Sequence, residues 1–356
     1  MYDIILSFIT ALVVTFYAIP SIIKVAKIKQ LVDMPGERRS HDEITPSLGG
    51  IAIFAGVLFS IVLWTPFNLF GDLQYILCAF TIIFLIGVKD DIVPISPKKK
   101  FAGEIFAAII LVTKSNIRLT SFHGLFGIYE IPFWFSFIVS MVTILLIINA
   151  FNLIDGINGL TGCITVLITS FMSAWFFLVD HLALSLIAFS TAGACIAFLY
   201  YNMTPAKIFM GDTGALFIGL ICSILSIQFI EVNNVIDESR FAIHSAPVVA
   251  IGILAIPVFD TLRVFSIRIL KGRSPFTADR QHIHHMMVDA GFTHMVSSVI
   301  LTAFNALIIY MVLSLQNLNI NFLLAILIGT MVIFTTILFY ASRPENIPSK
   351  GTEITK

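Results

Sequence analysis

The stretch Asn149-Ala-Phe-Asn-Leu-Ile-Asp-Gly-Ile-Asn-Gly159 ends an apolar run of about seventeen residues. Such a run is nearly long enough to cross a bilayer, so the stretch places strong hydrogen-bonding groups where a membrane helix ends. Asn149 and Asn152 are three residues apart and share a helical face, while two glycines and Asp155 stop the helix. The stretch therefore indicates either a polar site at a membrane face or an interfacial helix cap.

The composition is that of an integral membrane protein. Of 356 residues, 58% are hydrophobic and only 12% are charged, which a water-soluble domain of this size would not tolerate. The formal net charge is zero, so no overall field recruits nucleic acid. The four cysteines all lie in apolar runs without metal-binding spacing and are expected to be packing residues.

The apolar runs predict eleven membrane-spanning helices. They are expected near residues 2 to 23, 50 to 70, 73 to 88, 101 to 113, 132 to 153, 160 to 179, 182 to 201, 211 to 230, 244 to 268, 296 to 315 and 320 to 341. The first run lacks the basic start and cleavage site of a signal peptide and is expected to remain. The fourth is short and carries Glu104, so the count depends on it.

The distribution of Lys and Arg decides that case, because cytoplasmic loops carry an excess of them. With eleven spans and the N-terminus outside, 18 of these residues lie inside and 3 outside; without the fourth span the division is 12 against 9. The sequence therefore predicts an all-α polytopic protein with the N-terminus outside and the C-terminus inside.

The remaining segments complete this organisation. Alternation around His123-Gly124 predicts a small external β-hairpin near 117–131. No linker or repeat divides the chain, so residues 1–341 are expected to form one membrane-embedded domain, followed by a polar cytoplasmic tail at 342–356.

Two inside segments carry acids. Asp90 and Asp91 follow an apolar helix, where paired carboxylates are costly unless water, a basic partner or a cation such as Mg²⁺ compensates them. Asp212, in Phe209-Met-Gly-Asp-Thr-Gly214, opens another apolar run. The positive end of a helix suits phosphate and the carboxylate suits a bridging metal, although simple solvated acids and a helix cap fit the same pattern.

Two other inside loops are basic. Residues 31–50 contain Arg38 and Arg39, which either bind phosphate or only orient the protein. Asp260 and Arg263 form an i,i+3 pair that we expect to neutralise itself. The later segment Lys271-Gly-Arg-Ser-Pro-Phe-Thr-Ala-Asp-Arg-Gln-His-Ile-His-His285 lacks the thiolates usual in structural zinc sites, and its histidines beside arginines fit a phosphate or sugar better.

Together, Lys-Asp-Asp, Asn-Ala-Phe-Asn-Leu-Ile-Asp-Gly, Phe-Met-Gly-Asp-Thr-Gly and the histidine segment resemble the polyprenyl-phosphate N-acetylhexosamine-1-phosphate transferase family, and most closely its WecA-like branch. The resemblance covers most of the chain. It implies transfer of GlcNAc-1-phosphate from UDP-GlcNAc to undecaprenyl phosphate with release of UMP, which starts a lipid-linked cell-envelope glycan. It also implies Mg²⁺, with Mn²⁺ as a substitute, and an active site on the cytoplasmic face of the bacterial inner membrane.

The resemblance assigns roles residue by residue. The expected catalytic acids are Asp90 and Asp91; the metal ligands are Asp212 and Asn152; the nucleotide-binding residues are Asp155, Asn158 and Phe209; the phosphate- or sugar-binding residues are His41, Lys100, Arg280, His282, His284 and His285. Bacterial relatives commonly have aspartate where Asn158 stands, so an essential second carboxylate there is not expected in this chain.

A phosphate monoester has a second pKa of about 6, so near pH 7 it gains little from a carboxylate base. We therefore expect Asp90 and Asp91 to position metal and phosphate at least as much as to move a proton. A phospho-MurNAc-pentapeptide-type transferase and an ion-coupled transporter of lipid-linked sugars remain as alternatives. UDP-GalNAc, UDP-QuiNAc or UDP-FucNAc would fit with small changes, and a homodimer is one option for the assembly.

Overall fold

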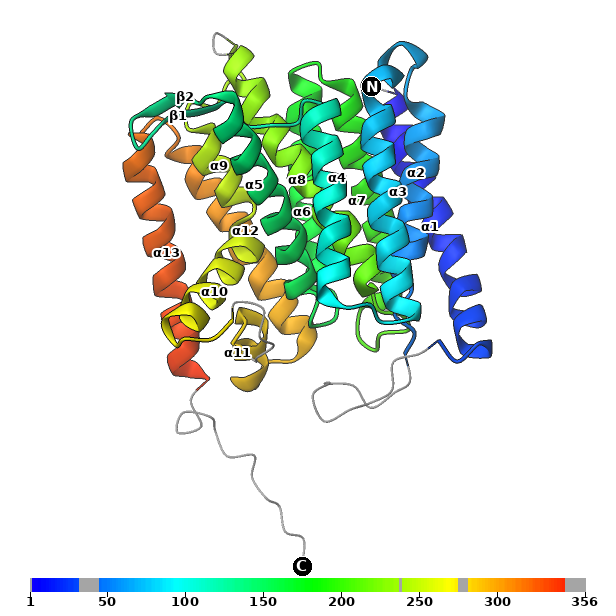
Figure 1. Cartoon of the computed structure of the whole chain (residues 1–356). Coiled ribbons are helices and arrows are strands. Elements are labelled where there is room, and N and C mark those ends of the chain that lie inside the picture. The colour runs from blue at the N-terminus through cyan, green and yellow to red at the C-terminus, as the bar shows by residue number, and fades with distance from the viewer. Residues whose placement is uncertain (1, 32–44, 237–238, 275–280, 343–356) are drawn as a thin grey trace, which may run out of the picture.

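The structure is a computed structural model that describes residues 2–31, 45–236, 239–274 and 281–342. The described chain is a bundle of long helices with one small sheet (Figure 1). Its elements are α1 (Tyr2–Ile28), α2 (Gly49–Trp64), η1 (Phe67–Leu69), α3 (Phe70–Ile92), α4 (Pro97–Lys114), β1 (Ser121–Leu125), β2 (Ile128–Glu130), α5 (Phe133–Ile154), α6 (Leu160–Leu178), α7 (Leu182–Asn202), α8 (Gly211–Val235), α9 (Ala246–Ile253), η2 (Ala255–Phe259), α10 (Asp260–Leu270), α11 (Ile283–Asp289), α12 (His294–Ser314) and α13 (Ile320–Ala341).

The chain is a multi-pass membrane protein. Seven of the described helices are long and apolar enough to cross a membrane, or eight if the bent pair from α9 to α10 is one span. A helix or this bent pair coincides with each predicted span, but α2, α3 and α4 are not among the seven. The count of eleven and the orientation of the termini therefore stay predictions.

The two ends of the bundle differ. The sheet of β1 and β2 lies at the same end as the N-terminus, whereas α10 and α11 lie at the opposite end (Figure 1). We call the first the hairpin end and the second, where α3 runs into α4 and α8 begins, the site end. Polar motifs that are far apart in the sequence are thereby gathered at one end.

Helix α8 is the most enclosed of these helices, with 89% of its most apolar window buried. Its first turn is approached closely by two neighbours through glycine. A Cβ atom at Gly50 of α2 would lie 2.0 Å from Gly214 N, and one at Gly87 of α3 would lie 2.4 Å from Thr213 Cα. The last turn of α3 is therefore held directly against the N-terminus of α8.

The predicted span at 244–268 is not one straight helix. It is broken at the π-helix η2 and bends by 84°. Pro257 explains the break, since it lacks an N–H and clashes with the preceding turn of a helix. Asn305 of α12 satisfies freed backbone groups: its Oδ1 accepts from Ile256 N at 3.0 Å and its Nδ2 donates to Ile253 O at 2.9 Å.

The hairpin predicted near 117–131 is confirmed, but its predicted turn is wrong. His123 and Gly124 lie within β1, and the chain reverses at Phe126 and Gly127. Both have positive φ, at 55° and 76°, as a two-residue turn of the type common in hairpins requires. Glu231 of α8 anchors the hairpin, accepting from Thr120 N at 2.7 Å and Thr120 Oγ1 at 2.6 Å.

Candidate active site

Four predicted site residues meet at the site end, and we call them the acid–lysine cluster: Asp90, Lys100, Asn152 and Asp212. Lys100 Nζ lies 3.1 Å from Asp90 Oδ2 and 2.8 Å from Asp212 Oδ2. With the amide of Asn152 oriented to suit its partners, its nitrogen donates to Asp212 Oδ1 at 2.7 Å and its oxygen accepts from Lys100 Nζ at 3.3 Å. Helices α3, α4, α5 and α8 each contribute one member.

Asp91 has a different position from its neighbour. It accepts from the backbone N–H of Asp212 at 2.7 Å and of Thr213 at 3.0 Å, and it also accepts from the Thr213 hydroxyl. These amides belong to the first turn of α8, whose N–H groups have no partner within the helix. Asp91 thus caps α8 from another helix and holds Asp212 in place, while Asp90 Oδ1 accepts from Ile95 N at 2.8 Å.

The donors of the acid–lysine cluster fit a hard cation. Mg²⁺ prefers oxygen ligands and is commonly bound by one or two carboxylates together with substrate phosphates. Two carboxylates and an amide oxygen here surround one positively charged group. These residues therefore fit a Mg²⁺ ion whose shell substrate phosphates complete.

The loop that connects α5 to α6 carries Asp155 and Asn158. Burial raises the pKa of Asp155 to about 7, and the carboxylates of Asp212 and Asp91 act in the same direction. Asn158 is buried; its Nδ2 donates to Thr204 Oγ1 at 3.4 Å and its backbone oxygen accepts from Ser298 Oγ at 2.7 Å. Asp155 therefore lies near the acid–lysine cluster, and Asn158 ties its loop to the segment before α8.

Phe209 lies in that segment and is half-buried. Its backbone N–H donates to Pro46 O at 2.8 Å and its carbonyl accepts from Gly49 N at 2.9 Å. The segment that carries Phe209 is thereby held to the entry of α2, two residues before α8 begins.

The histidine segment meets the loop after α5 through His284. The rings of His282 and His284 are stacked with centroids 5.8 Å apart, and His285 lies 4.2 Å from His284. A Cβ atom at Gly156 would lie 2.2 Å from His284 Nε2, so the ring rests on the backbone of that loop. Burial lowers the pKa of His284 to about 3, and His285 adds to the shift; His284 is therefore neutral near pH 7.

One residue of this site was wrongly interpreted from the sequence. Asp260 forms the expected pair with Arg263, with 2.8 Å between Oδ1 and NH2, but it does not merely neutralise this arginine. Its Oδ2 also lies 2.9 Å from His282 Nδ1. The signal available in the sequence was an acid at the end of an apolar run. The partner His282 could not be predicted from it, because the contact depends on the bend before α10.

A second acid was noticed in the sequence only as a complication for the span count. Glu104 is buried in α4 and accepts from Asn149 Nδ2 at 2.7 Å. Asn149, from the stretch that opened the sequence analysis, therefore binds a carboxylate one turn beyond Lys100. His41 and Arg280, both predicted to bind phosphate or sugar, lie outside the described residues.

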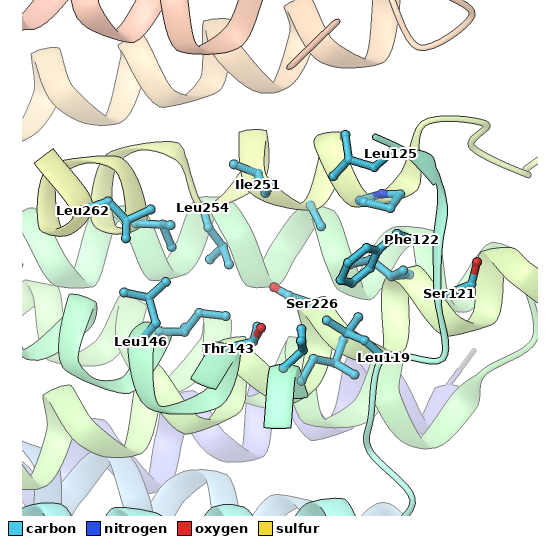
Figure 2. Close-up of a pocket in the computed structure, with 17 residues that line it drawn as sticks. Leu119, Ser121, Phe122, Leu125, Thr143, Leu146, Ser226, Ile251, Leu254 and Leu262 are labelled. Carbon is cyan, nitrogen blue, oxygen red and sulfur yellow. The ribbon is translucent and has the colours of Figure 1, made fainter. Parts of the chain in front are cut away.

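An apolar cavity of about 280 Å³ lies beside α5. Figure 2 shows the side chains that line it, which come from α5, α8, the bent pair and the hairpin with the segment before it. The lining includes Leu119, Phe122, Leu146, Ser226, Leu254 and Leu262. It extends from the hairpin to Leu262, at the beginning of α10, and its apolar lining is suited to an apolar ligand rather than a polar one.

The chain is similar in sequence to known proteins. Residues 73–230 match the sequence pattern of glycosyl transferase family 4. An undecaprenyl-phosphate alpha-N-acetylglucosaminyl 1-phosphate transferase of Escherichia coli (strain K12) is 31% identical, over 80% of this chain and 76% of the relative. One from Yersinia pestis is 32% identical, over 78% and 75%. A probable undecaprenyl-phosphate N-acetylglucosaminyl 1-phosphate transferase of Bacillus subtilis (strain 168) is 31% identical, over 85% and 82%.

Proposed function

The chain belongs to glycosyl transferase family 4, and from this premise we propose that it transfers N-acetylglucosamine-1-phosphate from UDP-GlcNAc to undecaprenyl phosphate and releases UMP. Its relatives in Escherichia coli and Bacillus subtilis are named for this kind of transfer. One observation in the structure supports the proposal above the others: Asp90, Lys100 and Asp212 meet at the N-terminus of α8. Anionic groups are favoured at such a terminus.

The proposed reaction joins two anions. An oxygen of the lipid phosphate attacks the phosphorus that bears the sugar, and the bond from this phosphorus to the oxygen of UMP breaks, so that UMP leaves with that oxygen. A bound Mg²⁺ would neutralise phosphate charge and orient the reacting groups. Asp212, Asn152 and Asp90 would hold the ion, and the Lys100 ammonium would then be available for a phosphate oxygen.

The geometry supports positioning rather than proton removal by the paired acids. Asp91 is occupied by the amides of α8, and Asp90 by Lys100 and Ile95 N. A lipid phosphate needs no strong base, since its second pKa is about 6 and it is already mostly dianionic near pH 7. We therefore assign Asp90 to the cation and phosphate, and Asp91 to the placement of α8.

The other substrates are assigned to the surrounding elements. We propose that Asp155, Asn158 and Phe209 line the nucleotide pocket, and that His282, His284 and His285 contact the diphosphate or the acetamido sugar. The apolar cavity between α5, α8 and the bent pair is our candidate for part of the isoprenoid chain. With the predicted eleven spans, this site end faces the cytoplasm, and Mn²⁺ is expected to substitute for Mg²⁺.

The ion-coupled transporter is less consistent with this arrangement. Transporters of that kind bind their ions near mid-membrane, at the interface of paired broken helices. Here the acid–lysine cluster lies at helix ends. Among the described helices there is one broken span, from α9 to α10, rather than a pair of them.

The test measures UMP release by the purified full-length protein with undecaprenyl phosphate. UDP-GlcNAc, UDP-GalNAc, UDP-QuiNAc, UDP-FucNAc and UDP-MurNAc-pentapeptide are compared, with Mg²⁺ and with EDTA. We expect equal amounts of UMP and lipid-linked sugar from UDP-GlcNAc, only with the metal and only with the lipid phosphate. Release of UMP from none of these donors would exclude a transferase; release from the pentapeptide donor alone would assign the other branch of the family.

A further inference from the structure

We propose that Asp260 is a positioning residue, which holds the ring of His282 in the orientation and protonation state that the substrate requires. The inference rests on the proposed transferase function, because His282 is there assigned to the diphosphate or sugar. Asp260 itself would touch neither substrate.

The hydrogen bonds of Asp260 join two segments that are distant in the sequence. Its Oδ2 lies 2.9 Å from His282 Nδ1, and its Oδ1 accepts from Ile283 N at 3.1 Å. Arg263 NH2 donates to the same Oδ1 at 2.8 Å and also to Gln281 O. The beginning of α10 therefore binds the backbone and side chain of three consecutive residues, 281 to 283, at the start of α11.

The burial of this carboxylate indicates a specific role. Asp260 is 1% exposed and follows directly on η2, at the bend of the apolar pair. A buried ionised carboxylate is costly unless it is paired and hydrogen-bonded. Closing the bend itself requires no carboxylate, because Asn305 already satisfies the freed backbone groups of η2. The contacts that Asp260 adds are those to Arg263 and to the histidine segment.

An ionised carboxylate only accepts hydrogen bonds, so the proton in this contact must belong to Nδ1 of His282. Nε2 is then the ring nitrogen that can face a ligand. Such a contact fixes both the ring orientation and the tautomer, as the carboxylate does in many catalytic histidine pairs.

The ring of His282 packs against other residues of the candidate site, so its orientation affects theirs. Its ring lies nearly parallel to that of His284, with 10° between their planes. His284 in turn rests on Gly156, next to Asp155. A rotated His282 would therefore disturb the neighbouring histidine and the loop proposed to bind the nucleotide.

The substitution Asp260→Asn separates positioning from simple structural support. An amide has one accepting and one donating end, so it cannot accept from His282 Nδ1 and from Ile283 N at opposite oxygens. If its oxygen remains with Ile283 and Arg263, its nitrogen faces His282 and forces the proton to Nε2. The fold keeps a polar group of the same size while the histidine is placed in the wrong tautomer.

The kinetic test compares wild type, Asp260→Asn, His282→Ala and the double variant in UMP release from UDP-GlcNAc. We expect Asp260→Asn to lower kcat/KM about 10- to 100-fold, as loss of an orienting partner commonly does. In the His282→Ala background the same change should cost about twofold or less, since its effect passes through the histidine. Glu231→Gln at the hairpin end is the matched control, because it also neutralises a carboxylate with two donors.

An equal loss from Asp260→Asn in both backgrounds would overturn the proposal and leave Asp260 a structural residue. The second measurement needs no Asp260 variant: ¹⁵N NMR of histidine-labelled wild type, with the His282 signal assigned by its loss in His282→Ala. We expect a proton on Nδ1, and a bare Nδ1 would contradict the proposal. Absence of UMP release from wild type would instead contradict the transferase function and leave the NMR result intact.

Discussion

Lys100 forms an ion pair with Asp212, the acid that we propose as a metal ligand, with 2.8 Å between Nζ and Oδ2. Asp90 lies on the other side of the same ammonium group. This ammonium group compensates part of the negative charge of the two acids, and we propose that it moves to a phosphate oxygen when substrate and metal bind.

This relationship predicts that Lys100→Gln strengthens metal binding and weakens catalysis. Without the competing ammonium, Asp90 and Asp212 should bind Mn²⁺ or Mg²⁺ about tenfold more tightly in the absence of substrate, which corresponds to about 1.4 kcal/mol. Transfer should slow about 10- to 100-fold, because phosphate charge is no longer compensated. The metal affinity is measured by titrating the protein with the metal and recording Tm at each concentration. The exposed Lys99→Gln is the control, and unchanged metal affinity in Lys100→Gln would refute the competition.

Asp90→Asn should reduce transfer steeply, by about 100-fold, without recovery between pH 7 and pH 9. Its amide can still accept from Ile95 N, but it no longer carries the charge that faces Lys100. The measurement is a pH profile of kcat for both proteins. Recovery of the variant at higher pH would show that Asp90 removes a proton from the lipid phosphate.

Asp91→Asn should act mainly on stability. The carboxylate accepts from Asp212 N at one oxygen and from Thr213 at the other, so an amide must turn its own donor towards one of these donors. An unsatisfied polar group costs about 1–3 kcal/mol when it is fully buried, and for the half-buried Asp91 we expect the lower part of this range. We expect a lower Tm for Asp91→Asn than for Asp90→Asn, measured in the same detergent. Equal Tm values for the two variants would argue against the capping role.

The sequence motifs predicted which residues meet, but not how they divide the work. Adjacent residues of a helix point in directions about 100° apart, and the motif alone does not say that Asp91, rather than Asp90, faces the amides of α8. The contact of Asp260 with His282 spans 22 positions and depends on the bend at Pro257. The hairpin was predictable from the alternation of apolar and polar residues. The position of its turn was not, because the sequence offers two pairs that contain a glycine, His123-Gly124 and Phe126-Gly127, and the chain reverses at the second.

Gly156→Ala should disturb the site through a side-chain clash and not through backbone strain, since Gly156 does not have a positive φ. The added Cβ would lie 2.2 Å from His284 Nε2, so the ring or the loop must shift. Overpacking of this kind typically costs about 1–3 kcal/mol. We expect a higher KM for UDP-GlcNAc and a lower Tm. Gly329→Ala in α13 is the control, since its Cβ would meet nothing within 4 Å; a variant Gly156→Ala as active and stable as this control would contradict the contact.

His284 should make the protein less stable as the pH falls. Burial lowers its pKa in the folded state from 6.5 to about 3, so between these values the unfolded chain binds more protons. The contribution of the neutral, buried His284 to the free energy of unfolding is complete above pH 6.5. Below this pH it decreases, by up to about 1.4 kcal/mol per pH unit. Asp155 has the opposite effect on stability as the pH falls, since its pKa is raised from 3.8 to about 7. Because it is present in both wild type and His284→Gln, its effect cancels when the two proteins are compared. The Tm of wild type should therefore fall more steeply from pH 7 to pH 5 than that of His284→Gln; parallel curves would mean that His284 is not held neutral by burial.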